Sequence, residues 1–139
     1  RRRMNEGITG LGELSQRIQK RADVGWFTAI DGRRIATPQP HACLNYLLQS
    51  CGAIVMKKAL VVFHYDLAKE AGFVRDDCPV KFNYVANVHD EIQLTADPDV
   101  AEELGKLFCR SLTVAAERLN MRCPLSGTYD IGNNWAETH

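Results

Sequence analysis

The sequence predicts an α+β fold in which antiparallel hairpins pack against long helices. Three patterns carry this prediction. Asp31-Gly32 separates two strand-like runs, a proline-free stretch over residues 41–71 repeats apolar residues every three or four positions, and two more strand-like runs lie at 81–88 and 91–95. The chain has 139 residues, 45% hydrophobic and 24% charged, which is typical of one globular domain over residues 1–139.

The N-terminal part of the chain predicts a short helix and then a hairpin. Residues 9–23 carry apolar side chains at three- and four-residue spacing in a polar segment, so we expect an amphipathic helix that ends near Gly25. The Asp31-Gly32 pair then predicts a hairpin over residues 26–37.

The middle of the chain predicts one long helix and a second hairpin. The helix should run from about 41 to 71, with Gly72 as its C-terminal cap. Along residues 81–88 apolar and polar side chains alternate, which predicts a strand with one packed face, paired with a second strand over 91–95.

The C-terminal part predicts a last helix and a short tail. Asp97 as N-cap and Pro98 at the first helical position should begin the helix. It should end near Leu119, with Asn120 as the stop. Residues 125–139 are expected to form a short strand and an end anchored by Trp135.

Composition and charge limit the classes of function. Net charge is zero, but residues 1–60 carry ten Lys and Arg against four Asp and Glu, whereas residues 61–139 carry seven against thirteen. This excludes a uniformly basic nucleic-acid-binding protein and leaves room for a basic flank facing phosphates and an acidic flank holding a cation. The five cysteines include no C-x-x-C pair, so we expect reduced thiols rather than disulfides or structural zinc.

No secretory or membrane-spanning segment is expected. The chain begins with three arginines and no apolar stretch behind them, and no apolar run reaches the ~20 residues that cross a bilayer. We therefore expect a cytoplasmic protein without a membrane partner.

The first candidate site is the His89-Asp90-Glu91 triplet of the second hairpin, in which His89 and Asp90 separate the strand-like runs and Glu91 begins the second run. Two adjacent acids at the end of a strand suit a divalent cation such as Mg²⁺, which takes oxygen ligands. An ordinary turn is the alternative, because aspartate is common in turns.

The second candidate site is a helical stripe of neutral polar residues. His41, Asn45 and Gln49 are spaced four apart, so they share one face of the long helix. Such side chains can bind the minor-groove acceptors of any base pair, and a solvated helix face is the alternative. Arg33 and Arg34, which follow the first turn, could contact phosphates or decorate an exposed strand.

Taken in order, four segments resemble the C-terminal part of family A DNA polymerases, the DNA polymerase I class. Within that family the resemblance is strongest to the replicative polymerases of T-odd-like bacteriophages. It covers residue 26 to the end, including the terminal His139. The matching segments are Ala29-Ile30-Asp31-Gly32-Arg33-Arg34, residues 40–53, Val88-His89-Asp90-Glu91-Ile92-Gln93 and Gly132-Asn133-Asn134-Trp135.

The resemblance implies roles for the candidate residues. The hairpin at about 81–96 corresponds to motif C of the palm subdomain, with Asp90 as one of two aspartates that hold two catalytic Mg²⁺ ions. His89 would lie near the primer terminus and Glu91 would support the site. Gln49 and Asn45 are similar to residues that touch the minor groove of the new base pair and its template side, while His41 stands where the bacterial enzymes have arginine.

Motifs A and B and the exonuclease domain of that family have no counterpart in this sequence. We therefore expect a fragment that acts on primer-template DNA and deoxynucleoside triphosphates only with an upstream polypeptide, and that exposes apolar surface for that partner or for self-association. A catalytically inactive remnant that binds DNA weakly or serves as an interaction domain is one alternative. A free-standing metal hydrolase centred on Asp90 is another.

Overall fold

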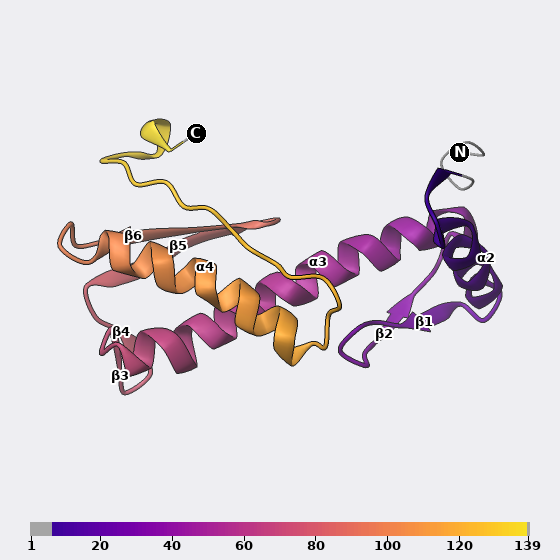
Figure 1. Ribbon diagram of the computed structural model, residues 1–139, viewed down its shortest axis with the longest axis horizontal. Helices are drawn as coiled ribbons and strands as arrows, with labels where there is room; N and C mark the ends of the chain where they lie inside the picture. Colours follow the sequence, from indigo (N-terminus) through magenta and orange to yellow (C-terminus); the bar gives the residue numbers. More distant parts are fainter. Residues whose placement is uncertain (1–6, 139) are drawn as a thin grey trace. The chain divides into compact units, whose positions relative to one another are not determined.

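The computed structural model describes residues 7–138, and it has the α+β class that the sequence predicts (Figure 1). Its six strands form three separate two-stranded antiparallel hairpins within the described residues. The elements in chain order are α2 (Leu11–Ala22), β1 (Trp26–Thr28), β2 (Arg34–Ala36), η1 (Pro40–Ala42), α3 (Cys43–Val62), η2 (Phe63–Ala68), β3 (Val74–Arg75), β4 (Cys78–Pro79), β5 (Phe82–Val88), β6 (Glu91–Ala96), α4 (Ala101–Arg118) and η3 (Trp135–Glu137).

Contacts within the chain group into two compact units, Arg1–Ile54 and Val55–His139. Each unit is considered by itself. The single domain expected over residues 1–139 therefore stays a prediction, and the terminal His139 of the family resemblance lies outside the described residues.

The first unit contains α2 and the β1–β2 hairpin that Asp31-Gly32 predicts. The hairpin pairs Trp26 with Ala36 and Thr28 with Arg34. Its loop closes with the Gly32 N–H donating to the Ala29 carbonyl and the Ala29 N–H donating to the Arg33 carbonyl. Gly32 has φ +88°, the left-handed conformation that ends a three-residue hairpin loop.

The long helix forms as predicted but is not uniform. A 3₁₀ turn, η1, precedes α3, and α3 continues into the π-helical turn η2. The helix ends where Gly72 (φ +82°) allows its own N–H and that of Phe73 to donate to the carbonyls of Lys69 and Ala68. This is a Schellman cap, and it confirms the predicted role of Gly72.

The π-helical turn matches the spacing of the buried side chains along the sequence. Val62 and Phe63 are completely buried, and the next buried pair is Leu67 and Ala68, five residues further on. Regular helical spacing would turn Asp66 inward with Leu67. The wider π turn leaves Asp66 at the surface, where its carboxylate lies 2.6 Å from the Arg118 guanidinium.

The core of the second unit forms around Phe63. The ring of Phe63 lies 4.9 Å from that of Phe108 on α4 and 5.7 Å from that of Phe82 on β5. The other buried members of this cluster are Ala68, Val74, Val100 and Leu104. The base of the β5–β6 hairpin is thereby fixed to both helices of the unit.

The start of α4 differs from the prediction. Asp97 and Pro98 lie in a turn, and the helix begins at Ala101 with Val100 as its N-cap residue. The Asp97 N–H donates to the Lys81 carbonyl at 2.8 Å, which holds Asp97 at the base of the hairpin instead of at a helix start. The predicted stop at Asn120 is confirmed, because Asn120 has φ +53° and is followed by the Met121 N–H donating to the Ala116 carbonyl.

The predicted strand in the C-terminal tail is wrong. Residues 121–134 contain no strand, and the tail runs along α4 instead. The Thr113 hydroxyl donates to the Leu125 carbonyl at 2.9 Å, and the Tyr129 ring lies against Gly105, which leaves no room for a Cβ there. Trp135 is 64% exposed, so it does not anchor the end of the chain in a core.

Within the described residues, one helical stretch, Pro40–Ala68, is long and apolar enough to cross a membrane by length and composition, contrary to the expectation that no such segment is present. Its apolar residues include Ala59, Val62 and Phe63, which are completely buried within the second unit. A core helix needs the same apolarity, so this stretch is weak evidence for a membrane span.

Candidate functional site: the turn of the β5–β6 hairpin

The candidate site is the two-residue turn between β5 and β6. Val88 pairs with Glu91, which leaves His89 and Asp90 as the turn. His89 has φ +55°, and a left-handed first residue is what tight hairpin turns require. Histidine adopts this conformation more readily than most residues, but without glycine's freedom from strain.

The structure places the three predicted residues next to one another at the tip of the hairpin, with His89 and Asp90 in the turn and Glu91 as the first residue of β6. His89, Asp90 and Glu91 are all exposed. The Glu91 carboxylate accepts a hydrogen bond from the Gln93 amide at 2.8 Å, whereas within residues 7–138 no hydrogen bond or ion pair engages the Asp90 carboxylate. The oxygens of Asp90 are therefore available to a ligand such as a cation.

The residues at the hairpin tip do not by themselves form a metal site. No group of three His, Cys, Asp or Glu side chains that could hold a metal ion occurs among the described residues. The chemistry of the turn fits Mg²⁺, which often takes one or two carboxylates and completes its shell with water and phosphate.

The sequence predicted one packed face along residues 81–88, but in β5 that face is buried only at the base of the hairpin. Phe82 is 2% exposed, but Tyr84 is 38% and Val88 48% exposed. The pairing passes from Tyr84–Leu94 directly to Ala86–Gln93, so Val85 is an extra residue that forms a β-bulge. A bulge interrupts the alternation of side chains, which is why the pattern fails beyond Tyr84.

Tyr84 connects the hairpin to the π-helical turn. Its hydroxyl lies 3.0 Å from Nδ1 of His64, and its ring makes edge contacts with Phe63 and Phe82. Burial, followed by the nearby Tyr65, raises the pKa of Tyr84 to about 12. His64 was not among the residues predicted from the sequence, where its signal is the five-residue spacing between the apolar pairs Val62-Phe63 and Leu67-Ala68.

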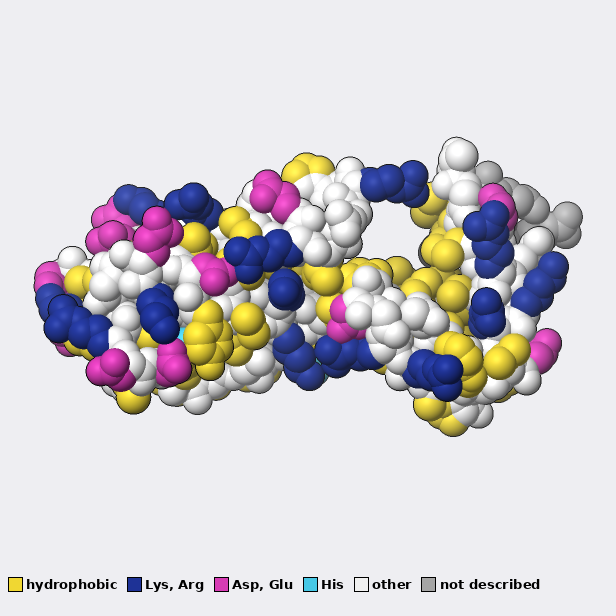
Figure 2. Space-filling model, turned by 90° about the horizontal axis from the view of Figure 1, so that it is seen from below, with side chains coloured by type: hydrophobic (Ala, Val, Ile, Leu, Met, Phe, Trp, Pro, Cys, Tyr) yellow, Lys and Arg dark blue, Asp and Glu magenta, His cyan; other side chains and the backbone are white. Residues whose placement is uncertain are grey.

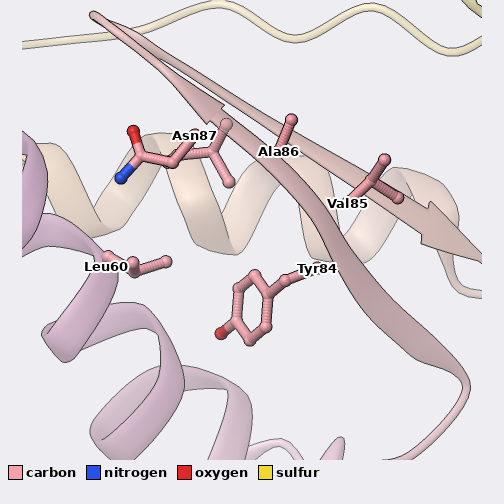
Figure 3. A pocket seen from close by; sticks show the side chains of 6 residues that line it. Leu60, Tyr84, Val85, Ala86 and Asn87 are labelled. Carbon is pink, nitrogen blue, oxygen red and sulfur yellow. The ribbon is translucent and has the colours of Figure 1, made fainter.

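A small hollow of about 180 Å³ lies beside this contact, between α3 and the hairpin (Figure 3). Leu60 and Tyr84 point into it from the helix and from β5, and the rest of its lining comes from Val85, Ala86, Asn87 and Ile92. Val85 is nevertheless 60% exposed. On the face shown in Figure 2, hydrophobic side chains lie among charged ones.

The three polar residues of the helical stripe are exposed, but they do not all lie on the same helix. Asn45 and Gln49 lie one turn apart on α3, and His41 lies in the preceding 3₁₀ turn. All three are exposed in the first unit. Their proposed contact with a minor groove stays a prediction.

Both arginines of the first hairpin already have partners. The Arg33 Nε donates to Asp31 at 2.6 Å, and the Arg34 guanidinium lies 4.2 Å from the centroid of the Trp26 ring. The two side chains remain exposed, so such contacts orient them without burying their charge. Their contact with phosphate stays a prediction.

The fold is that of part of a DNA polymerase domain. The solved polymerase domain of Pol1 from M. smegmatis, in complex with DNA primer-template and dNTP, matches 76% of this chain with a TM-score of 0.61 at 21% sequence identity. This match covers 20% of the solved chain.

The sequence comparisons identify the family. The model of DNA polymerase family A matches residues 16–137, so the chain belongs to that family. It is 32% identical over 133 residues to the DNA-directed DNA polymerase of Escherichia phage Phieco32, and 31% identical over 115 residues to that of Escherichia phage T7. These alignments cover 91% and 82% of this chain, but the chain spans only 20% and 16% of the two relatives.

Proposed function

We propose that this chain forms the part of a DNA-directed DNA polymerase palm that carries motif C, with Asp90 as a metal ligand. The observation that supports this most directly is the Asp90 carboxylate, exposed at a two-residue turn and unengaged within residues 7–138, in a chain of family A. A second carboxylate would be supplied by polypeptide outside this sequence, because the described residues hold no cluster of three potential ligands.

In the proposed mechanism the Asp90 carboxylate would hold Mg²⁺. Two bound Mg²⁺ ions would activate the 3′-hydroxyl and neutralise the leaving pyrophosphate. His89, held at φ +55°, would contact the primer terminus, and Glu91, bonded to Gln93, would support the turn.

The first unit would contribute contacts to DNA. Asn45 and Gln49 present neutral donors and acceptors that match the minor-groove edge of any base pair. His41 would contact the primer, and Arg33 and Arg34 the phosphates. With zero net charge, this chain should bind duplex DNA weakly unless other polypeptide contributes basic residues.

The test is primer extension with Mg²⁺ and deoxynucleoside triphosphates, using the chain alone and then mixed with the polypeptide encoded immediately upstream. We expect extension only in the mixture, and its loss in Asp90→Ala. Extension by the 139-residue chain alone would contradict the need for a partner. Absence of extension in both samples would favour the inactive remnant or interaction domain. For a phage-encoded polymerase the setting would be the host cytoplasm.

A further inference from the structure

Two backbone irregularities in the second unit are joined by one side-chain contact. The π-helical turn Phe63–Ala68 interrupts the long helix, and the β-bulge at Val85 interrupts the β5–β6 ladder. His64 is the second residue of the π turn, and Tyr84 immediately precedes the bulge. Their hydrogen bond, 3.0 Å from Nδ1 to the hydroxyl oxygen, links residues twenty apart in sequence.

At the π turn, two adjacent side chains contact the hairpin in different ways. Phe63 is completely buried and makes ring contacts with Phe82, Tyr84 and Phe108. His64 is only half-buried, and its ring lies 5.8 Å from that of Tyr84. Phe63 therefore holds the base of the hairpin through apolar packing, and His64 adds a directional bond at the residue before the bulge.

Within residues 7–138, β5 has few contacts with other elements beyond Tyr84. Among the side-chain hydrogen bonds and ring contacts of these residues, those of Tyr84 are the nearest to the turn that tie β5 to another element. Val85 is 60% and Val88 48% exposed, and the hollow lined by Leu60, Asn87 and Ile92 lies where closer packing would otherwise hold the strand. Because a bulge changes the bend and twist of its strand, whatever fixes the bulge also fixes the direction of the tip.

The hydrogen bond between His64 and Tyr84 can form with the imidazole in either tautomer or in its protonated form. Burial raises the pKa of Tyr84 to about 12, so the phenol keeps its proton. A hydroxyl can donate to an unprotonated Nδ1 or accept from an Nδ1–H, so either histidine tautomer and the imidazolium satisfy it.

We propose that His64 and Tyr84 are positioning residues, whose hydrogen bond fixes the β-bulge and thereby the direction in which the hairpin presents His89 and Asp90. The inference rests on the proposed function only for the reason why the direction of His89 and Asp90 matters, namely metal and primer binding. The positioning itself is a property of the folded chain and can be tested without DNA or metal.

The experiment is NMR on the 139-residue chain, with residual dipolar couplings for orientation and amide exchange for local stability. In Tyr84→Phe, which keeps the ring and removes the hydroxyl, we expect the couplings of Val88–Glu91 to change relative to those of α4. Protected amides from Ala86 to Gln93 should exchange about fivefold faster. The Nδ1 resonance of His64 should shift because its partner is lost.

Tyr65→Phe is the matched control, since Tyr65 lies on the same π turn and is 53% exposed. It should leave the couplings of the turn unchanged. His64→Ala should reproduce the effect of Tyr84→Phe, and His64→Asn, whose amide can occupy the place of Nδ1, should restore the native couplings.

Unchanged couplings at Val88–Glu91 in Tyr84→Phe would overturn the proposal. Exchange that accelerates equally in α4 and in the hairpin would overturn it as well, because it would mean a general loss of stability. If the couplings change as expected but Asp90→Ala leaves primer extension intact, the positioning stands and the proposed function fails.

Discussion

The β1–β2 and β5–β6 hairpins each carry an aspartate in their loop, and the two carboxylates differ in their hydrogen bonds. In the β1–β2 loop, Asp31 accepts hydrogen bonds from the Arg33 backbone N–H at 3.2 Å and from its Nε at 2.6 Å. In the β5–β6 turn, no hydrogen bond or ion pair within the described residues engages the Asp90 carboxylate. The first carboxylate is committed to holding its own loop, and the second remains open to a ligand.

The turn residues beside the aspartates show the same contrast. The left-handed position of the first loop is Gly32 at φ +88°, which carries no strain, whereas in the second turn it is His89 at φ +55°. Strained residues in tight turns are often retained for function. The β1–β2 loop is thus free of backbone strain, whereas the β5–β6 turn holds a strained residue beside the carboxylate that we propose as a metal ligand.

The largest expected effect is on activity. Asp90→Ala should reduce primer extension by the complemented polymerase roughly 10²–10³-fold, because a metal ligand supports several kcal/mol of charge stabilisation. Its free energy of unfolding, measured by urea denaturation, should match that of the parent chain. A clear loss of stability would mean that Asp90, like Asp31, is a structural residue.

The next effect is on the stability of the first hairpin. Gly32→Ala should lower the free energy of unfolding by about 1 kcal/mol, since a Cβ there meets open space but the backbone is left-handed. Urea denaturation of the two chains measures this difference. Equal stability would show that the loop can adopt another turn.

A smaller effect of opposite sign is expected in the second hairpin. His89→Gly should raise the free energy of unfolding by about 0.5 kcal/mol, because relief of the left-handed strain exceeds the entropy that glycine adds to the unfolded chain. A thermal melt of this variant beside Gly32→Ala compares the turns directly. A destabilised His89→Gly chain would mean that the imidazole itself holds the turn.

The smallest effect concerns the pH dependence of Asp31. Desolvation acts to raise its pKa, but hydrogen bonds from Arg33 and the charge of its guanidinium outweigh this and place the pKa below the ordinary 3.8. The stabilising contribution should therefore be present above pH 4 and be lost as pH falls through the lowered pKa. Unfolding of Asp31→Asn and the parent chain should differ slightly at pH 7 and converge in acid, and a difference that grows in acid would reverse the assignment.

Local sequence signals predicted those parts of the fold that local interactions decide. Asp31-Gly32 predicted the first hairpin, Gly72 the end of the long helix and Asn120 the end of α4, because each acts through its own backbone conformation. The strand-like runs at 81–88 and 91–95 likewise predicted that His89 and Asp90 separate two strands, which the pairing of Val88 with Glu91 confirms.

Features that depend on distant partners were missed. Asp97-Pro98 carries every mark of a helix start, but the Lys81 carbonyl takes the Asp97 N–H. The bulge at Val85 and the hydrogen bond between His64 and Tyr84 depend on contacts between residues far apart in the sequence, which three- and four-residue periodicity does not reveal. The predicted tail strand has no partner strand among the described residues, and α4 holds that segment through Thr113 instead.

The central claim is that Asp90, unlike Asp31, is free to bind a divalent cation. The most direct test is a titration of the ¹⁵N-labelled chain with substoichiometric Mn²⁺, reading paramagnetic broadening of the backbone amides. We predict that broadening is strongest at His89, Asp90 and Glu91, that the Asp31 loop stays sharp, and that Asp90→Ala abolishes the effect at the turn. Broadening of equal strength at Asp31 and Asp90, or broadening that persists in Asp90→Ala, would contradict the account.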